Sequence, residues 1–447
     1  MPRFVVLIHA SAQSGSSYGP RPPPAAENAE SSKTSSGSPS RRKSSCSGIE
    51  TKVAVLSLVE QEVSEVMSKL PSSANRNSPQ IVDWFSGFVR GMAVGDALGL
   101  PREGLSRRRA VRLFGEAPLQ HRFISGRGMV SDDTEHMWET ALALIEHPDD
   151  ASAFAKSLAR RLRWWLLRLP AGVGLATARS LVKSWLGWPP DRSGVRSAGN
   201  GPAMRAGIIG LCLSRDETLM REFVRASTRL THSDPRAESG AMMIALAARE
   251  IVHSAGTNGS PVSIDAKAML ALCRGEANHP DWDRALNAVA ESLAAAESSS
   301  QFAERLGQQR GVSGYIVFTV AAVLFCWLRW PGEFRRPVEE IILLGGDTDT
   351  TAAILGGLAG AACGADQIPY EWSRYMAEIP RDEEWQGTLG RLLFGRFWLQ
   401  HEYPEEYQAS WNNLKSPPEL RWMLALRNPF FLAVVLSHGF RRLLPPY

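Results

Sequence analysis

One segment, ILLGGDTDTTAAILGGLAGAACG at residues 342–364, constrains the fold of this chain more than any other. Most of its residues after position 351 are Ala, Gly, Leu or Ile, and side chains this small allow another backbone to approach a helix closely. Just before them, Asp347, Asp349 and Thr350 place two carboxylates and a hydroxyl at the start of the expected helix. We therefore expect a tightly packed helix whose first turn carries hard oxygen ligands.

A second acidic cluster, Ser131-Asp132-Asp133-Thr134, also stands at the start of a helical pattern. If the two clusters face each other, their four aspartates and the hydroxyls of Ser131 and Thr350 form a cradle whose charge two Mg²⁺ or Mn²⁺ ions would balance. Such ions lower the pKa of a shared water, which suits metal-assisted hydrolysis. The alternative is helix capping, which we favour for the upstream cluster taken alone. The downstream cluster holds three oxygen side chains where capping needs one.

Charge and cysteine usage exclude several classes of protein. The 447 residues carry a formal net charge of +4. The first fifty residues contribute +3 of it, so the remainder shows no electrostatic footprint for nucleic acid. Five scattered cysteines without C-x-x-C spacing argue against a disulfide framework and a zinc site, and favour a reducing, cytoplasmic setting.

Two apolar runs bear on secretion and membranes. Phe4–Ile8 is shorter than the ~7 to 15 residues of a signal-peptide core. Phe430–Leu436 is far below the ~20 residues that span a bilayer. We expect a buried terminal helix and no membrane partner.

Changes in amino-acid composition along the chain predict four parts. Residues 1–50 are rich in Ser and Pro and are expected to be a disordered tail. Residues 51–80 predict a helical arm and linker, residues 81–400 one helical domain, and residues 401–447 a C-terminal helical extension. No convincing period-2 alternation is present, which favours an all-α body.

Residues 152–188 predict further helix, interrupted at Pro170 and rich in tryptophan. Because we find no basic stripe beside these aromatics, we expect them in the core rather than as stacking platforms for bases. The residues concerned are Trp164, Trp165, Trp185 and Trp188.

Other polar positions have two open interpretations each. The loop Gly199-Asn200-Gly201 offers backbone N–H groups for an anion at a helix start, or is a simple tight turn. His232, before Pro235, contacts a ligand or caps its helix. Glu103, placed after a sharp stop at Pro101, is a mobile acid or base or an ordinary surface residue.

Six motifs occur in the order typical of one family: GMAVGDALGLPREG, SDDTEHMWETALAL, GNGPAMRAGIIGL, THSDPRAESGA, GVSGYIV and LLGGDTDTTAAILGGLAGA. Across about residues 84–370 the chain therefore resembles the ADP-ribosylglycohydrolase family, related to dinitrogenase reductase activating glycohydrolase. The resemblance implies an all-helical, orthogonally packed domain with a binuclear Mg²⁺ or Mn²⁺ site. It also implies cleavage of the glycosidic bond that joins ADP-ribose to a side chain or small molecule.

The resemblance also implies roles for individual residues. Glu103 would stand near the entry to the metal centre, and a carboxylate of Asp132, Asp133 or Glu103 would take a proton from water. Gly199, Asn200 and Gly201 would line the diphosphate and ribose region, and Gly314, Tyr315 and His232 would hold the substrate. Ser131 stands where the family often has threonine, which keeps the oxygen donor. The implied metal ligands are Ser131, Asp132, Asp133, Asp347, Asp349 and Thr350.

The leading hypothesis is a metal-dependent hydrolase, expected to be a monomer, that releases ADP-ribose from a protein side chain, arginine above all. A second hypothesis keeps the site and changes the substrate to serine-linked ADP-ribose, O-acetyl-ADP-ribose or another small-molecule conjugate. A third is a non-catalytic, crystallin-like ADP-ribose binder, which the presence of all four aspartates disfavours.

Overall fold

The computed structural model describes residues 78–254, 262–399, 421–442 and 444. The tail predicted at residues 1–50, nearly all of the arm predicted at 51–80 and the first half of the extension predicted at 401–447 lie outside these residues. The predicted domain boundaries stay predictions.

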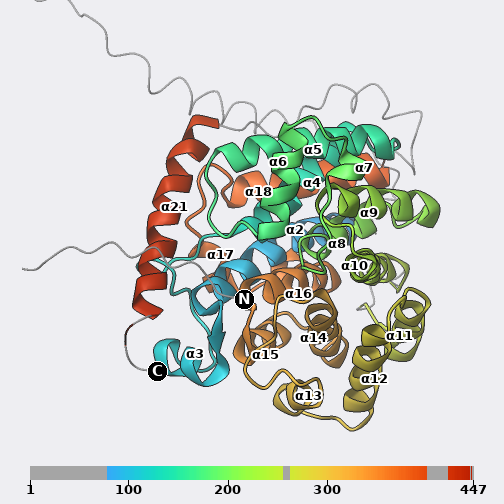
Figure 1. The fold of residues 1–447 in the computed structure, drawn as a ribbon. Helices are drawn as coiled ribbons and strands as arrows, with labels where there is room; N and C mark the ends of the chain where they lie inside the picture. The colour runs from blue at the N-terminus through green and yellow to red at the C-terminus, as the bar shows by residue number, and fades with distance from the viewer. Residues whose placement is uncertain (1–77, 255–261, 400–420, 443, 445–447) are drawn as a thin grey trace, which may run out of the picture. The chain divides into compact units, whose positions relative to one another are not determined.

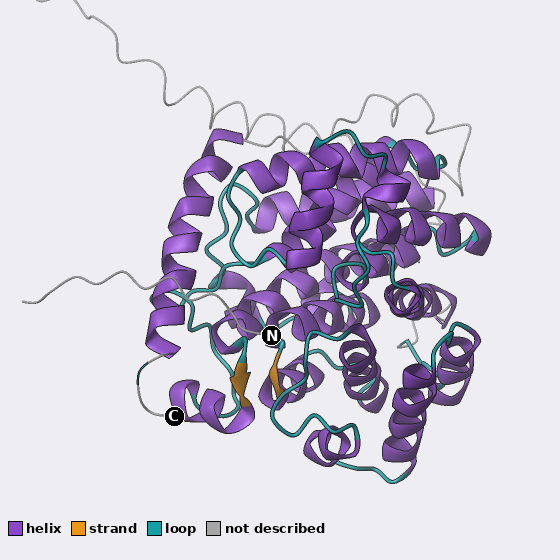
Figure 2. Cartoon of the chain, viewed as in Figure 1, coloured by secondary structure: helices purple, strands orange, loops and turns teal. Residues whose placement is uncertain are grey.

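Helices make up most of the described chain (Figures 1 and 2), which confirms the all-α prediction. Its one sheet pairs β1 (Leu105–Ser106) antiparallel with β2 (Gly345–Gly346). The short 3-10 helices η1 (Leu100–Arg102) and η2 (Ala365–Gln367) and the π-helix η3 (Gly395–Leu399) extend longer helices. In chain order the α-helices are α2 (Ser78–Gly99), α3 (Arg107–Phe114), α4 (Asp132–Glu146), α5 (Ala151–Leu167), α6 (Leu175–Trp185), α7 (Pro190–Ser193), α8 (Ala203–Cys212), α9 (Glu217–Thr231), α10 (Pro235–Ser254), α11 (Ala266–Gly275), α12 (Pro280–Ala294), α13 (Ser299–Arg305), α14 (Ile316–Arg329), α15 (Arg335–Leu344), α16 (Thr348–Cys363), α17 (Tyr370–Arg374), α18 (Glu383–Phe394) and α21 (Arg421–Arg442).

Helices α2 and α16 pack against each other at the centre of the fold (Figure 1). Small residues face each other along both helices, so the two backbones touch. A Cβ placed on Gly91 would overlap the carbonyl of Gly356, and one on Gly356 would overlap the carbonyl of Gly91. The same holds for Gly87 and Gly360 one turn away. The close packing expected of the small-residue segment is confirmed.

Other helices surround this central pair and bury its remaining faces. Helix α14 lies between α12 and α16, α10 packs on α8, and α4 contacts both α5 and α8. Helix α18 covers α2. Because α2, α4, α8 and α16 are thus fixed against one another, the loops at their ends are held in fixed relative positions.

The tryptophan prediction is right for one residue and wrong for three. Trp165 is buried, but Trp164, Trp185 and Trp188 are 58%, 43% and 49% exposed. The expectation that no basic stripe accompanies them is also wrong. Residues 151–190 hold seven Lys or Arg and no Asp or Glu. Two of these cations lie over exposed rings, with Arg163 Cζ 5.3 Å from the Trp185 centroid and Lys183 Nζ 4.5 Å from that of Trp188.

The terminal helix α21 differs from the buried helix that we expected. Most of it is exposed, and only one face packs on the protein body. Its stretch Met423–Arg441 is long and apolar enough to cross a membrane, by length and composition alone. Its buried face includes Arg427, which forms ion pairs with Glu135 at 2.9 Å and Glu378 at 2.8 Å. These ion pairs support a helix docked on the helical body.

Candidate functional site

The first half of the site is the N-terminus of α4. Ser131 is its N-cap, and its Oγ accepts a hydrogen bond from the backbone N–H of Asp133 at 3.3 Å. From α2, the fully buried Asp96 accepts bonds from the N–H groups of Ser131, at 3.0 and 3.1 Å, and of Thr134, at 3.2 Å. Since Asp96 satisfies these backbone donors, Asp132 and Asp133 are left for other partners.

The second half is the N-terminus of α16. Gly345 and Gly346 have φ of 78° and 87°, a region that favours glycine, and they turn the chain sharply before Asp347. The pairing of β1 with β2 sets Leu105 opposite Gly346, which brings the neighbouring Glu103 to the same place. Asp347 is the N-cap residue, yet its side chain caps no backbone N–H. The capping interpretation therefore fails for Asp347.

Hydrogen bonds join the two helix ends directly. Thr350 Oγ1 donates to Asp133 Oδ2 at 3.0 Å, and Ser131 Oγ donates to the same oxygen at 3.2 Å. Asn200 Nδ2 donates to Asp347 Oδ2 at 2.7 Å. The structure thus brings together the two acidic clusters, which are more than 200 residues apart in the sequence.

Close packing of carboxylates raises their pKa values. Burial raises the pKa of Asp132 well above its usual value, and the charges of Asp133, Asp96 and Glu103 raise it further. The pKa of Asp349 rises in the same way, from burial and from Glu103 and Asp347. Burial raises the pKa of Asp96 to about 7, against the hydrogen bonds that lower it. The site concentrates negative charge that a cation would stabilise.

The residues present fit a divalent metal in the chemistry of their donors. Asp133 Oδ1, Asp349 Oδ1 and Asn200 Oδ1 are buried oxygens with no hydrogen-bond partner, and buried polar atoms normally have one. Carboxylate, hydroxyl and amide oxygens suit Mg²⁺ or Mn²⁺. In the described part of the chain, no three His, Cys, Asp or Glu side chains already form a metal-binding group. Hydroxyls hold part of the cradle together, since Ser131 and Thr350 both donate to Asp133 Oδ2.

The glycine loop lies over a neutral histidine. A Cβ on Gly201 would come within 2.8 Å of the His232 ring, so glycine is required for this close approach. Burial, with the neighbouring Arg205 charge, lowers the pKa of His232 to about 3. Thr231 Oγ1 accepts from Arg205 Nη2 at 2.7 Å and lies 2.9 Å from His232 Nδ1. When this hydroxyl donates to Nδ1, the ring proton lies on Nε2, the nitrogen beneath Gly199.

A cavity of about 320 Å³ collects most of the residues singled out from the sequence. Ser131 is not among its lining residues; it lies beneath them as a helix cap. Tyr315 is not brought to the wall either, because its hydroxyl donates to Asp281 at 2.6 Å and accepts from Arg236 at 3.1 Å. Its backbone instead pairs with Gly199. The predicted residues that line the cavity are Glu103, Asp132, Asp133, Gly199, Asn200, Gly201, His232, Gly314, Asp347, Asp349 and Thr350.

Two contributions to the site were missed from the sequence. Asp96 stood out as an acid on a small-residue surface, but nothing local indicated that it would cap a helix 35 residues away. The loop between α5 and α6 also lines the cavity, and a Cβ on Gly172 would come within 2.6 Å of Asp132 Oδ1. Its Gly-rich composition after Pro170 was the available signal.

Comparison with known proteins yields one family model and several relatives. A family model described as ADP-ribosylglycohydrolase matches residues 77–402. An ADP-ribosyl-[dinitrogen reductase] glycohydrolase of Rhodospirillum rubrum is 27% identical over 314 residues, covering 68% of this chain and 94% of the relative. An ADP-ribosylarginine hydrolase, Tri1, of Pseudomonas putida is 26% identical over 67% of this chain and 75% of its own length. The solved structure of an ADP-ribosylglycohydrolase-related protein complex matches with a TM-score of 0.52 and 26% identity, over 70% of this chain and 99% of its own.

Proposed function

We propose that this chain, which belongs to the ADP-ribosylglycohydrolase family, releases ADP-ribose from arginine side chains of modified proteins with the help of two divalent cations, Mg²⁺ or Mn²⁺. Its activity as a glycohydrolase follows from the family and its relatives. The arginine linkage is supported by the name of the similar Tri1 protein. Cytoplasmic location and a monomeric state remain predictions.

The observation that carries the metal requirement is the set of buried, unpaired oxygens at the two helix ends. Asp133 Oδ1 and Asp349 Oδ1 face a shared cavity and have no hydrogen-bond partner. The residues that would hold the cations are Asp132, Asp133, Asp347, Asp349 and Thr350, which line the cavity, with Ser131 behind them, its Oγ 3.2 Å from Asp133 Oδ2. When bound, such cations polarise substrate oxygens and lower the pKa of water.

The residues of the chain would bind, orient and transfer protons around that centre. The glycine loop at 199–201 lines the cavity and offers backbone N–H groups near a helix start, which suits the diphosphate of ADP-ribose. The pKa of His232, about 3, leaves its ring neutral at pH 7, so it adds no positive charge that would repel the proposed cations. Asp132, Asp133 or Glu103 would accept the proton of the attacking water. The water oxygen bonds to the anomeric carbon as the bond to the guanidine breaks, and the leaving nitrogen takes up a proton.

A substrate panel tests the proposal. The full chain is incubated with arginine-linked, serine-linked and acetyl-linked ADP-ribose, each with Mg²⁺, Mn²⁺ or EDTA, and free ADP-ribose is quantified. We expect metal-dependent release that is fastest from arginine and lost in Asp349→Ala. Asp191→Asn, a change of a distant exposed carboxylate, is the matched control. Faster release from serine or acetyl conjugates would reassign the linkage, and binding without release would indicate a non-catalytic binder.

A further inference from the structure

Large apolar side chains are exposed on α5, on α6 and on the loop between them. We call this the α5–α6 surface. On α6 and at its C-cap, Leu175, Val182 and Leu186 recur at helical spacing on the solvent-facing side. Trp164 of α5 meets Trp185 of α6 edge to face, with centroids 5.9 Å apart. The surface comprises Trp164, Leu167, Leu169, Leu175, Val182, Trp185, Leu186 and Trp188. Exposed apolar side chains gathered in this way mark interaction sites.

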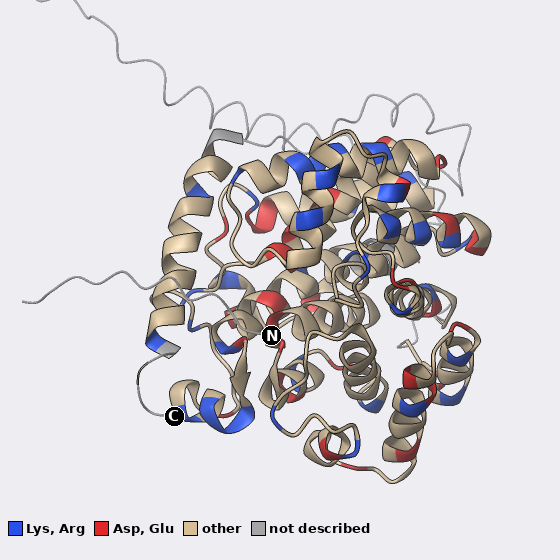
Figure 3. Ribbon diagram, in the orientation of Figure 1, with Lys and Arg blue, Asp and Glu red and all other residues tan. Residues whose placement is uncertain are grey.

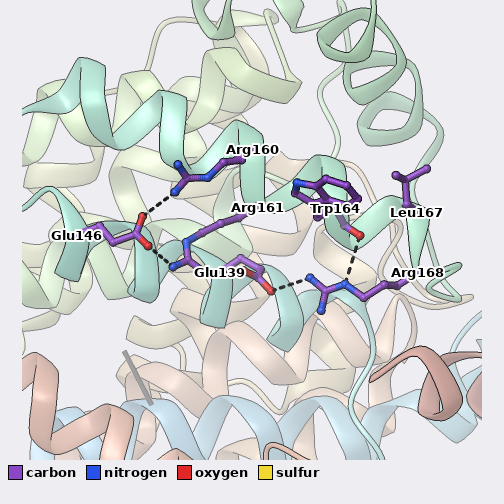
Figure 4. A pocket seen from close by; sticks show the side chains of 7 residues that line it. All are labelled: Glu139, Glu146, Arg160, Arg161, Trp164, Leu167 and Arg168. Atoms are coloured by element: carbon purple, nitrogen blue, oxygen red, sulfur yellow. Dashed lines mark hydrogen bonds and ion pairs between the residues drawn. The ribbon is translucent and has the colours of Figure 1, made fainter. Parts of the chain in front are cut away.

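The same surface carries an excess of positive charge, as Figure 3 shows along α5 and α6. Residues 151–190 hold seven Lys and Arg and no Asp or Glu. Arg160, Arg161 and Arg168 pair with Glu139 and Glu146 of α4, and Lys156 lies near Asp150. Arg160 and Arg161 pair with Glu146 at the wall of a cavity of about 520 Å³ (Figure 4). Trp164 forms part of that wall. A partner that fits this surface is therefore acidic as well as apolar.

The α5–α6 surface is continuous with the candidate active site. Leu175 belongs to the surface and also lines the site cavity, together with Gly172 and Gly174 of the same loop. Gly172 lies directly against Asp132. A macromolecule whose modified side chain enters a cavity of about 320 Å³ must rest its own surface on the rim. Specific protein contacts bury about 800 Å² per partner, more than the cavity mouth offers.

The geometry favours a polypeptide over nucleic acid as the occupant. Bases stack on open aromatic faces, but Arg163 and Lys183 already lie over Trp185 and Trp188. Trp164 packs edge to face against Trp185, and the other exposed side chains are leucine and valine, which pack against apolar protein side chains and offer no stacking face. We propose that the α5–α6 surface docks the polypeptide of the ADP-ribosylated substrate, which presents acidic and apolar side chains to it. This inference rests on the proposed function.

The test compares one protein ADP-ribosylated on arginine with ADP-ribosylated free arginine. The variant is the full chain carrying Trp164→Ser and Leu186→Ser, two exposed positions. The matched control carries Leu426→Ser and Phe440→Ser, which change side chains of similar exposure on α21 (66% and 69%, against 75% for Leu186). Equal melting temperatures verify that both variants fold.

We expect KM for the modified protein to rise about tenfold in the α5–α6 variant, with kcat unchanged, as for loss of an interface hot spot. Release from free ADP-ribosyl-arginine and all kinetics of the α21 control stay as in the wild type. Added salt should weaken turnover of the modified protein more than that of the small conjugate.

Several other results would overturn the docking proposal. Unchanged KM for the modified protein removes the surface from substrate binding. If the variant instead loses single-stranded RNA binding in a fluorescence titration, or loses a dimer in sedimentation, the occupant is nucleic acid or a second copy. If the wild type releases ADP-ribose from neither substrate, the proposed function itself fails, which is a separate outcome.

Discussion

Replacing Arg427 with methionine should lower the unfolding free energy of this protein far more than its place on a mostly exposed helix suggests. Arg427 pairs with Glu135 at 2.9 Å and with Glu378 at 2.8 Å, and all three side chains are almost fully buried. Its Nη2 also donates to the carbonyl of Val130 at 2.7 Å. Arg427→Met keeps an apolar stem of similar length but leaves two buried carboxylates without a counter-ion.

The loss should be about 3–5 kcal/mol of unfolding free energy, the usual cost of removing one partner from a buried ion pair. That is a large part of the ~5–15 kcal/mol that stabilises a typical domain. Because Val130 directly precedes Ser131, affinity for Mg²⁺ should also fall, by about tenfold. Urea denaturation measures the first quantity and titration calorimetry the second.

The pH dependence of the loss identifies its cause. Burial raises the pKa of Glu378 above its usual 4.5, even with Arg427 present. Between the unfolded and folded pKa values the native state binds more protons, so stability falls as pH rises through that window. Without Arg427 the folded pKa rises further, and the loss should be smaller near about pH 5 than near about pH 8.

A second substitution provides the control. Glu378→Gln keeps the Oε1 acceptor of the Val130 N–H, which lies at 2.6 Å, and removes the charge. Added to Arg427→Met, it should restore roughly half of the lost stability. Leu426→Ala, on the exposed side of α21, should stay within about 0.5 kcal/mol of the wild type. A loss below about 1 kcal/mol for Arg427→Met, or one that neither pH nor Glu378→Gln changes, would refute the reasoning.

Three further predictions follow from packing and charge. Gly91→Val should cost more than about 4 kcal/mol of unfolding free energy, measured by heat or urea, because its Cβ would overlap the α16 backbone. Gly275→Ala, which has open space around it, should leave stability unchanged. Similar losses for both variants would contradict the packing argument. Burial raises the pKa of Glu139, but the charges of Arg381, at 2.7 Å, and of Arg161 and Arg168 together outweigh it and hold that pKa below 4.5. The contribution of Glu139 to stability is therefore present above pH 4.5 and lost as pH falls through its folded-state pKa. Glu139→Gln should flatten the acid limb of a stability–pH curve. An unaltered acid limb would count against the ion pair. In EDTA, Asp349→Asn should melt higher than the wild type because it relieves repulsion among buried carboxylates. Mg²⁺ at 100 times its Kd should stabilise the wild type by about 2.7 kcal/mol and the variant much less; equal shifts would exclude Asp349 as a ligand.

Much of the secondary structure was predictable because it depends on neighbours in the sequence. Ser131 begins α4 as expected, Pro170 separates α5 from α6, and Pro235 opens α10. Small residues at 352–364 identified the helix that packs most closely. The residues of the candidate site could be named because six motifs in order resemble one family, whose model matches the chain.

Burial and pairing across the fold were not predictable in the same way. The spacing of Trp164 and Trp185 is compatible with a core or a solvent-facing side, and only the packing of α5 and α6 left both exposed. Tyr315 adjoins the glycine loop through its backbone, yet its hydroxyl points to Asp281. An amphipathic pattern shows that a helix has faces, but not which neighbour covers each face.

The sequence by itself determined that this chain is helical, where its principal helices begin, and which oxygen-bearing side chains stand at two of those beginnings. Local hydrogen bonding and helical periodicity are sufficient for that. Only the tertiary structure decided that Asp96 satisfies the backbone of α4, that Thr350 bridges to Asp133, and that α21 places Arg427 behind the site. These contacts join residues 38 to about 290 positions apart, and their geometry depends on how closely the helices between them pack.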